Sequence, residues 1–174
     1  GNSSVYCPGG GGAFKLADSA DWFFDSNDFT IETWIKTKQI TPGTVIAQDD
    51  NTAADPNFTI RINSTANKID ILIYNGTLYI VTSSTSVNDG NWHHIAVVKY
   101  SGTVYLYVDG VSEGTPLVVG ALLNSSGSLA IGARGDYTSE LFFEGYIDEP
   151  RISKGIARYT SNFTPETFAY SYIE

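Results

Sequence analysis

The fold class is decided by one stretch of the sequence, Asp89-Gly-Asn-Trp-His-His-Ile-Ala-Val-Val-Lys-Tyr-Ser-Gly-Thr-Val-Tyr-Leu-Tyr-Val-Asp-Gly110. Two runs rich in β-branched and aromatic residues, 95–98 and 104–108, lie on either side of Ser101-Gly102. Such residues favour strands, and a short turn with glycine between two strand-like runs predicts a β-hairpin. Asp109-Gly110 then ends the second run.

The alternation of apolar and polar residues with a period of two recurs along nearly the whole chain. We expect further strands at 29–35, 58–62, 69–74, 77–81, 129–131 and 142–152. Asn75-Gly76 separates two of them, and we expect a two-residue hairpin turn there. One segment, 153–159, looks helical for one or two turns. Many short strands, with turn signals about every 8 to 12 residues, predict an all-β antiparallel sandwich or barrel.

Length and composition are those of a single folded domain. The chain has 174 residues, of which 42% are hydrophobic, 13% aromatic and 17% charged, and the low charge and high aromatic content argue against disorder and coiled coil. The net charge of −9 disfavours nucleic acid and anionic membrane surfaces as partners, since both need clustered Lys and Arg. No apolar run approaches the roughly 20 residues of a membrane helix, so we expect no membrane insertion. Residues 1–4 lack signal-peptide character, and we expect one domain, 1–174, excised from a larger protein.

Four segments together resemble one protein family. Two of them read Asp28-Phe-Thr-Ile-Glu-Thr-Trp-Ile35 and Phe143-Glu-Gly-Tyr-Ile-Asp-Glu-Pro-Arg-Ile152, and the others are 89–98 and 104–110. In this order and spacing they look like a laminin G-like (LamG) domain of the concanavalin A-like lectin/glucanase superfamily, over residues 4–168. The tail, 154–165, is similar to versions found in phage tail proteins and bacterial surface adhesins. The resemblance implies an antiparallel two-sheet jelly-roll sandwich.

The resemblance leaves three function classes open, because this fold carries lectins, enzymes and plain adhesion modules. We expect a non-catalytic recognition or adhesion module of a larger surface or phage tail protein. It would be extracellular, on a cell surface or virion, and would bind a polysaccharide, a cell-surface glycan or a surface protein. The alternatives are a polysaccharide-cleaving enzyme, such as a glucanase or lyase, and a structural spacer domain.

The spacing of carboxylates separates the enzyme from the binding module. Most glycosidases use two carboxylates that flank one bond, and in the glucanases of this superfamily they lie four residues apart on one strand. Glu32 and Asp70 have no acidic residue at strand spacing, whereas Glu144 and Asp148 are four residues apart. The resemblance gives the aspartate of this closing strand a structural role, so we predict no catalytic residue.

The resemblance also implies one structural calcium ion. Calcium takes oxygen ligands in loose geometry, and the matching residues are the carboxylate of Asp148 and carbonyls of the glycine loop, at Gly9 and Gly10. Pro8 stands where the family usually has an aspartate, and the glycine loop also fits a plain turn between two edge strands. A second oxygen-rich candidate is Asp49-Asp50-Asn51 with Asp55, which also fits a solvated acidic loop.

A sugar-binding surface needs aromatic faces for the ring C–H groups, and polar groups for the hydroxyls. If the isoleucine and valine faces of the strands point to the core, the opposite faces show Arg61, Asp70, Tyr74, Tyr105 and Tyr107. Tyr79 joins them if Leu78 and Ile80 point inward. We expect Tyr105 and Tyr107, about 6 to 7 Å apart along their strand, to line a subsite beside Arg61 or Asp70.

Two alternatives to this platform stay open. Tyrosines populate exposed sheet faces because their β-propensity is high, without any ligand. A site at the rim of the sandwich would instead use aromatic residues in turns: Trp22, Phe23, Phe24 or Tyr137.

The remaining aromatic and titratable residues are expected to be structural. We expect Trp34 and Trp92 in the core, with their indole N–H groups paired to backbone. His93 and His94 must point to opposite faces of a strand, so they cannot bind one metal from the same face. We expect one to be packed and the other to lie near the surface. The single cysteine, Cys7, excludes an internal disulfide and is expected to be buried.

Overall fold

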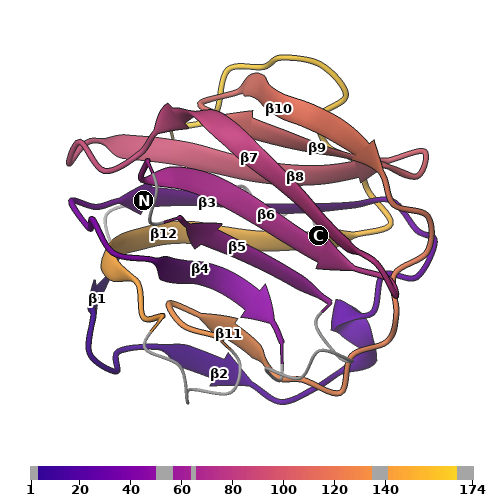
Figure 1. Cartoon of the computed structure of the whole chain (residues 1–174), viewed down its shortest axis with the longest axis horizontal. Coiled ribbons are helices and arrows are strands. Elements are labelled where there is room, and N and C mark those ends of the chain that lie inside the picture. Colours follow the sequence, from indigo (N-terminus) through magenta and orange to yellow (C-terminus); the bar gives the residue numbers. More distant parts are fainter. Residues whose placement is uncertain (1–3, 50–56, 64–65, 135–140, 168–174) are drawn as a thin grey trace.

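The computed structural model describes residues 4–49, 57–63, 66–134 and 141–167, and it contains two six-stranded sheets. Sheet A has the order β1 (Val5–Pro8), β12 (Glu144–Lys154), β3 (Phe29–Lys36), β8 (Trp92–Tyr100), β9 (Thr103–Val108) and β10 (Val111–Val118). Sheet B has the order β2 (Phe14–Leu16), β11 (Leu129–Ile131), β4 (Gly43–Gln48), β5 (Phe58–Ile62), β6 (Lys68–Tyr74) and β7 (Leu78–Ser86). Neighbouring strands are antiparallel, and the sheets lie one behind the other in Figure 1. The predicted jelly-roll sandwich is confirmed.

The core lies between the two sheets and follows the predicted alternation. Every second residue of the central strands is buried there, as in Phe58, Ile60 and Ile62 of β5. Phe24 is fully buried in this core, where its ring stacks on Phe29 with 4.4 Å between centroids. Cys7 is buried in the same core, as expected.

The two predicted hairpin turns have different lengths. Tyr100 pairs with Thr103, so Ser101-Gly102 is a two-residue turn, and both residues have positive φ, 49° and 77°. Tyr74 instead pairs with Leu78, so the turn after β6 has three residues, 75–77, and the predicted two-residue turn is wrong. Asn75 does not adopt the positive φ that such a turn requires of its first residue.

The extra turn residue changes which face of β7 is buried. A shift of one residue sends every side chain of a strand to the other face of its sheet. As a result Leu78 and Ile80 are exposed, whereas Tyr79 packs against the core. Tyr79 therefore does not lie on the outer face of sheet B, where we expected it.

A fully buried carboxylate, Glu32 of β3, lies on the outer face of sheet A. Arg151 donates to Glu32 Oε1 from Nε at 2.8 Å, and its Nη2 lies 2.7 Å from the same oxygen. The hydroxyl of Tyr159 donates to Oε2 at 2.8 Å, and His94 Nε2 lies 3.3 Å from Oε2. These contacts join β3, β8, β12 and the segment that follows β12.

The segment after β12 crosses the outer face of sheet A as an extended chain. The predicted helix at 153–159 is wrong: β12 continues to Lys154, and Gly155 turns the chain with φ of 78°. Two backbone positions are fixed by the side chain of Thr30, which donates to the carbonyl of Ile156 and accepts from the N–H of Arg158. Such bonds compete with a helix, because they use the backbone groups that a helix would pair internally.

The network around Glu32 changes the pKa of its carboxyl group. Burial alone would raise the pKa of Glu32, but hydrogen bonds from His94, Tyr159 and Arg151 outweigh burial and lower it. A lowered carboxyl pKa stabilises the fold above the unfolded-state value, about 4.3, and this contribution is lost as the pH falls through the folded-state pKa. The network therefore stabilises the fold near neutral pH, and this stabilisation is lost in acid.

His93 and His94 point to opposite faces, as predicted, but neither lies at the surface. His93 Nδ1 lies 2.8 Å from Asp109 Oδ2, and its Nε2 lies 3.1 Å from Asp89 Oδ1. Burial would lower the pKa of His93, but the hydrogen bonds to Asp109 and Asp89 outweigh burial and raise it.

We predict that replacing Glu32 by alanine lowers the free energy of unfolding by about 3 to 5 kcal/mol, because the change removes the buried carboxylate that Arg151, Tyr159 and His94 share. Chemical denaturation measures the loss. The matched control is Arg158→Met: Arg158 is partly exposed and its Nε lies 3.8 Å from Glu32 Oε1, so a loss below about 1 kcal/mol is expected. Equal losses in both variants would contradict the central role of the carboxylate.

We also predict that stability falls between about pH 6 and about pH 8. A raised histidine pKa stabilises the fold fully below the unfolded-state value, about 6.5, and the contribution is lost as the pH rises through the folded-state pKa. Denaturation of the wild type and of His93→Gln at the two pH values tests this. The variant should lose less stability across the interval than the wild type, and an identical loss would refute the assignment to His93.

Candidate functional site

Two of the predicted ligand residues come together on the outer face of sheet B. Arg61 of β5 pairs across the sheet with Asp70 of β6. Tyr74 shares this face but lies four residues, about 13 Å, along β6 from Asp70. Arg61 Nη2 lies 3.4 Å from Asp70 Oδ2. Asp70 Oδ1 also accepts from Asn63 Nδ2 at 2.9 Å and from Thr82 Oγ1 at 2.8 Å. Asp70 thus fixes the polar side chains of three neighbouring segments.

These polar groups line a cavity of about 510 Å³, which we call the Arg61 groove. Its lining residues are Pro42, Arg61, Asn63, Asp70, Ile80, Thr82 and Leu141. The Nε of Arg61 is buried and has no hydrogen-bond partner among the described residues. A buried donor left unpaired costs free energy, and a ligand oxygen would recover that cost. The groove therefore combines acceptors, donors and an apolar wall.

The predicted tyrosine subsite is not part of this groove. Tyr105 and Tyr107 belong to β9, in sheet A, so their outward faces point away from sheet B. Tyr107 is also buried, because Tyr159 and Phe163 stack on each other with 3.5 Å between centroids and cover it. Alternation assigned both tyrosines to an outer face correctly, but not to the same side of the molecule as Arg61.

The predicted calcium ligands are not gathered either. The register of β1 and β12 pairs Pro8 with Glu144 and Val5 with Ile147, so the glycine loop follows the Glu144 end of the ladder. Asp148 lies four residues along the strand from Glu144, a separation of about 13 Å. Asp148 and the carbonyls of Gly9 and Gly10 therefore do not fit one ion.

The second calcium candidate lies only partly in the described part of the chain. Asp49 is buried and accepts from Arg134 Nε at 2.9 Å, so its charge is paired. Asp50, Asn51 and Asp55 lie outside the described residues. In the part of the chain that the structure describes, no group of three or more His, Cys, Asp or Glu side chains is placed to hold a metal.

The aromatic residues of the alternative rim site are buried or partly buried where the structure describes them. Trp22 packs against the core and donates from Nε1 to the carbonyl of Ala17 at 3.2 Å. Phe24 is fully buried and Phe23 is partly buried. Tyr137 lies outside the described residues.

An aromatic surface that the sequence did not predict lies on sheet A. The strand register aligns Tyr6 of β1, Tyr146 of β12, Lys36 of β3 and Trp92 of β8 on one outer face, and we call this set the aromatic row. Trp92, expected in the core, is 37% exposed, and Trp34, its neighbour on the outer face, packs its ring against His94. Alternation could have placed each residue outward, but the order of the strands is not visible in the sequence.

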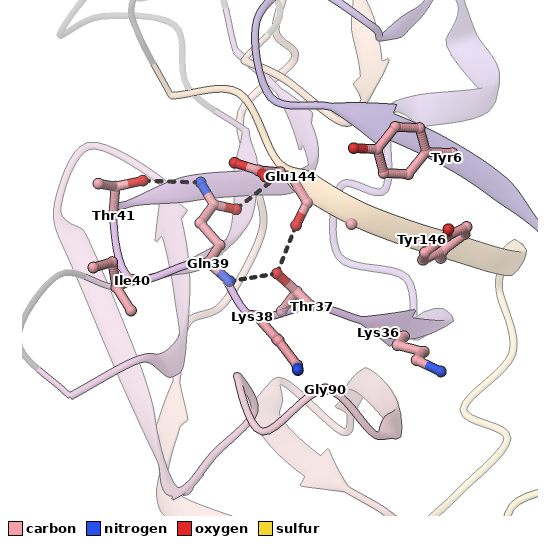
Figure 2. Close-up of a pocket in the computed structure, with 11 residues that line it drawn as sticks. Tyr6, Lys36, Thr37, Lys38, Gln39, Ile40, Thr41, Gly90, Glu144 and Tyr146 are labelled. Carbon is pink, nitrogen blue, oxygen red and sulfur yellow. Dashed lines mark hydrogen bonds between the residues drawn. The ribbon is translucent and has the colours of Figure 1, made fainter.

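A cavity of about 390 Å³ adjoins the aromatic row (Figure 2). Its wall is held by Thr37, whose hydroxyl donates to the carbonyl of Glu144 at 2.6 Å, and by the side chain of Gln39. Gln39 Nε2 donates to the carbonyl of Phe142 at 2.9 Å, while Gln39 Oε1 accepts from the N–H of Glu144 at 2.8 Å. Gly145 allows this close approach, since a side chain there would collide with the carbonyl of Lys36.

The chain belongs to the family that its sequence resembles. A laminin G family model, described as the concanavalin A-like lectin/glucanases superfamily, matches residues 8–157. The sandwich of two six-stranded antiparallel sheets is the fold of this superfamily. Within the described residues no helix is long and apolar enough to cross a membrane.

One relative by sequence is a much larger protein. The chain is 40% identical over 79 residues to the sushi, von Willebrand factor type A, EGF and pentraxin domain-containing protein 1 of Rattus norvegicus. That alignment covers 40% of this chain and 2% of the rat protein, so the chain spans a small part of its relative.

Three solved structures are similar over most of the chain. Domain 4 of the extracellular arabinanase AbnA from Geobacillus stearothermophilus, in complex with arabinotriose, has a TM-score of 0.67 at 21% identity, over 88% of this chain and 71% of that one. Mouse laminin α1 domains LG4-5 have a TM-score of 0.67 at 19% identity, over 94% of this chain and 47% of that one. The Ruminococcus gnavus sialidase module CBM40, bound to α2,3-sialyllactose, has a TM-score of 0.66 at 12% identity, over 91% of this chain and 92% of that one. At these identities the likeness establishes the fold alone.

We predict that Asp148→Ala leaves the response of the melting temperature to calcium and to chelator the same as in the wild type. Asp148 lies about 13 Å along β12 from Glu144, beside which the glycine loop begins, so its carboxylate and the loop carbonyls do not share an ion. The matched control is Gly10→Ala, which keeps the backbone carbonyl and whose Cβ meets no atom within 4 Å. Thermal melts with calcium and with chelator measure the response, and a response lost in Asp148→Ala alone would return Asp148 and the loop to an ion site.

Proposed function

We propose that this chain is a non-catalytic carbohydrate-recognition module and that the Arg61 groove is its binding site. The observation that carries the proposal is the network around Asp70, which holds Arg61, Asn63 and Thr82 around one cavity. Because hydrogen bonds already hold these side chains in place, ligand binding costs little side-chain entropy.

The chemistry of the groove matches the two sides of a sugar. Guanidinium, amide, carboxylate and hydroxyl groups donate to and accept from sugar hydroxyls. Ile80 is exposed at the groove, and Leu141 also lines it. This apolar surface would cover the C–H side of a sugar ring.

The relatives support an extracellular setting within a larger protein. Domain 4 of AbnA belongs to an extracellular arabinanase and was solved with arabinotriose, and the CBM40 module was solved with α2,3-sialyllactose. By analogy we place this module outside the cell, as part of a surface protein or a phage tail protein, with a polysaccharide or cell-surface glycan as partner. A surface protein as partner and a pure spacer role are the alternatives.

The enzyme alternative rests on Glu144 and Asp148, which share one face of β12 at the four-residue spacing of the glucanases. The family resemblance gives the aspartate of this strand a structural role, and the carboxylate of Glu144 lies against Gly9. We therefore favour the non-catalytic module. A panel of polysaccharides tests this directly: we expect no release of reducing ends and no unsaturated product, and release of either would make the chain an enzyme.

We predict that Arg61→Gln weakens binding of the glycan selected on an array by at least about tenfold, because hydrogen bonds from a charged donor contribute about 1.5 to 3 kcal/mol. Titration calorimetry with that glycan measures the change. Asp70→Asn should weaken binding too, since it loosens the side chains that Asp70 holds.

The matched control for the groove is Tyr105→Phe, on the opposite face of the molecule, which should bind like the wild type. Loss of binding in Tyr105→Phe with full binding in Arg61→Gln would move the site to sheet A. If the wild type binds no glycan on the array, a protein partner or a spacer role replaces the proposed function.

A further inference from the structure

Three large aromatic side chains are exposed side by side on sheet A, away from the Arg61 groove. Tyr6 is 56% exposed, Tyr146 42% and Trp92 37%. The ring centroids of Tyr6 and Tyr146 are 5.1 Å apart, and those of Tyr146 and Trp92 are 6.4 Å apart. Single exposed apolar residues need no explanation, but a contiguous patch of rings marks an interaction surface.

The aromatic row runs across the strands, and its length is set by the sheet. Tyr6, Tyr146, Lys36 and Trp92 occupy one position on each of four neighbouring strands. The two steps between ring centroids along the row, 5.1 Å and 6.4 Å, are each close to the length of one sugar unit. The rings of Tyr6 and Tyr146 are tilted by 45° rather than stacked, so their faces stay open to a ligand.

The cavity beside the aromatic row is organised before any ligand arrives. Gln39 and Thr37 are buried, and their hydrogen bonds fix the backbone at Glu144 (Figure 2). The N–H of Gln39 in turn donates to the hydroxyl of Thr37 at 2.9 Å. Binding therefore does not have to order this wall.

Two lysines give the surface its charge preference. Lys36 stands within the aromatic row, and Lys38 lines the adjoining cavity with its stem against Gly90 (Figure 2). Neither ammonium has an ion-pair partner among the described residues, whereas all four arginines lie within ion-pair distance of carboxylates. The carboxylate of Glu144 also lines the cavity, but it lies against Gly9. Unpaired ammonium groups beside aromatic rings favour an anionic ligand.

We propose that the aromatic row is a second binding site, specific for an acidic oligosaccharide. Trp92, Tyr146 and Tyr6 contact the C–H faces of successive sugar units, while Lys36 and Lys38 bind their carboxylates. The site is on the opposite sheet from the Arg61 groove and does not depend on it. A molecule with both sites holds two glycan segments at once.

The test is a titration with a matched pair of probes, trigalacturonate and its methyl ester, which differ in charge. Calorimetry at low salt should give an affinity for the acid about tenfold higher than for the ester, and added salt should remove most of that difference. Trp92→Ala should weaken binding of both probes by about tenfold or more. Lys36→Gln should weaken binding of the acid alone, and Lys36→Arg should restore it.

Two control variants separate this site from the rest of the molecule. Tyr100→Ala removes another exposed ring from β8, at the far end of the strand, and should bind like the wild type. Arg61→Gln should also leave binding of trigalacturonate unchanged, whatever it does to the glycan of the groove. If Trp92→Ala does not fold, Tyr6→Ala replaces it, since Tyr6 is the most exposed ring of the row.

Four results would overturn the proposal. They are no binding of either probe, equal binding of acid and ester, unchanged binding in Trp92→Ala, and loss of binding in Arg61→Gln, which would place the acid in the groove. Sedimentation adds a fifth. A wild-type dimer that Trp92→Ala converts to a monomer would mean that a second copy of the chain covers the row.

Discussion

The ion pair between Glu32 and Arg151 is the contact on which the outer face of sheet A depends. A buried carboxylate is costly unless charged and hydrogen-bonding partners surround it, and here these come from β12, β8 and the segment after β12. Because Tyr159 is one of the partners, the chain after Gly155 must cross the sheet over Glu32 and Tyr107. The pair thus decides which half of the sheet is covered.

As far as the structure describes it, the segment after β12 covers only part of the outer face of sheet A, and the rest of that face is exposed for binding. Tyr159 and Phe163 bury Tyr107 at the β9 side, whereas among the described residues nothing buries Tyr6, Tyr146 and Trp92 at the start of β8. On the other sheet, Asp70 plays a similar organising role: it is also buried, and its partners are Arg61, Asn63 and Thr82. Each outer face is therefore organised by one buried carboxylate.

The location of the sites depends on which strands pair and in which register, and the alternation of apolar and polar residues does not give this information. Arg61 and Tyr105 both point outward, yet β5 and β9 belong to different sheets, so they face opposite sides of the sandwich. Tyr79 turned inward because the turn at Asn75 has three residues rather than two. Asp148 and the glycine loop were separated by the register of β1 and β12. In each case the local pattern was sound, and a non-local partner decided the outcome.

The sequence by itself determined the all-β class, the family, the positions of most strands and the core faces of the central ones, because side-chain alternation and turn residues are local properties of the chain. Arg61 and Asp70 could be paired from sequence, since β5 and β6 are consecutive neighbours. The tertiary structure alone decided the aromatic row, because its four residues come from strands that neighbour one another only after distant parts of the chain pair. It also decided the extended tail over Glu32, where long-range hydrogen bonds outweighed a local helical preference.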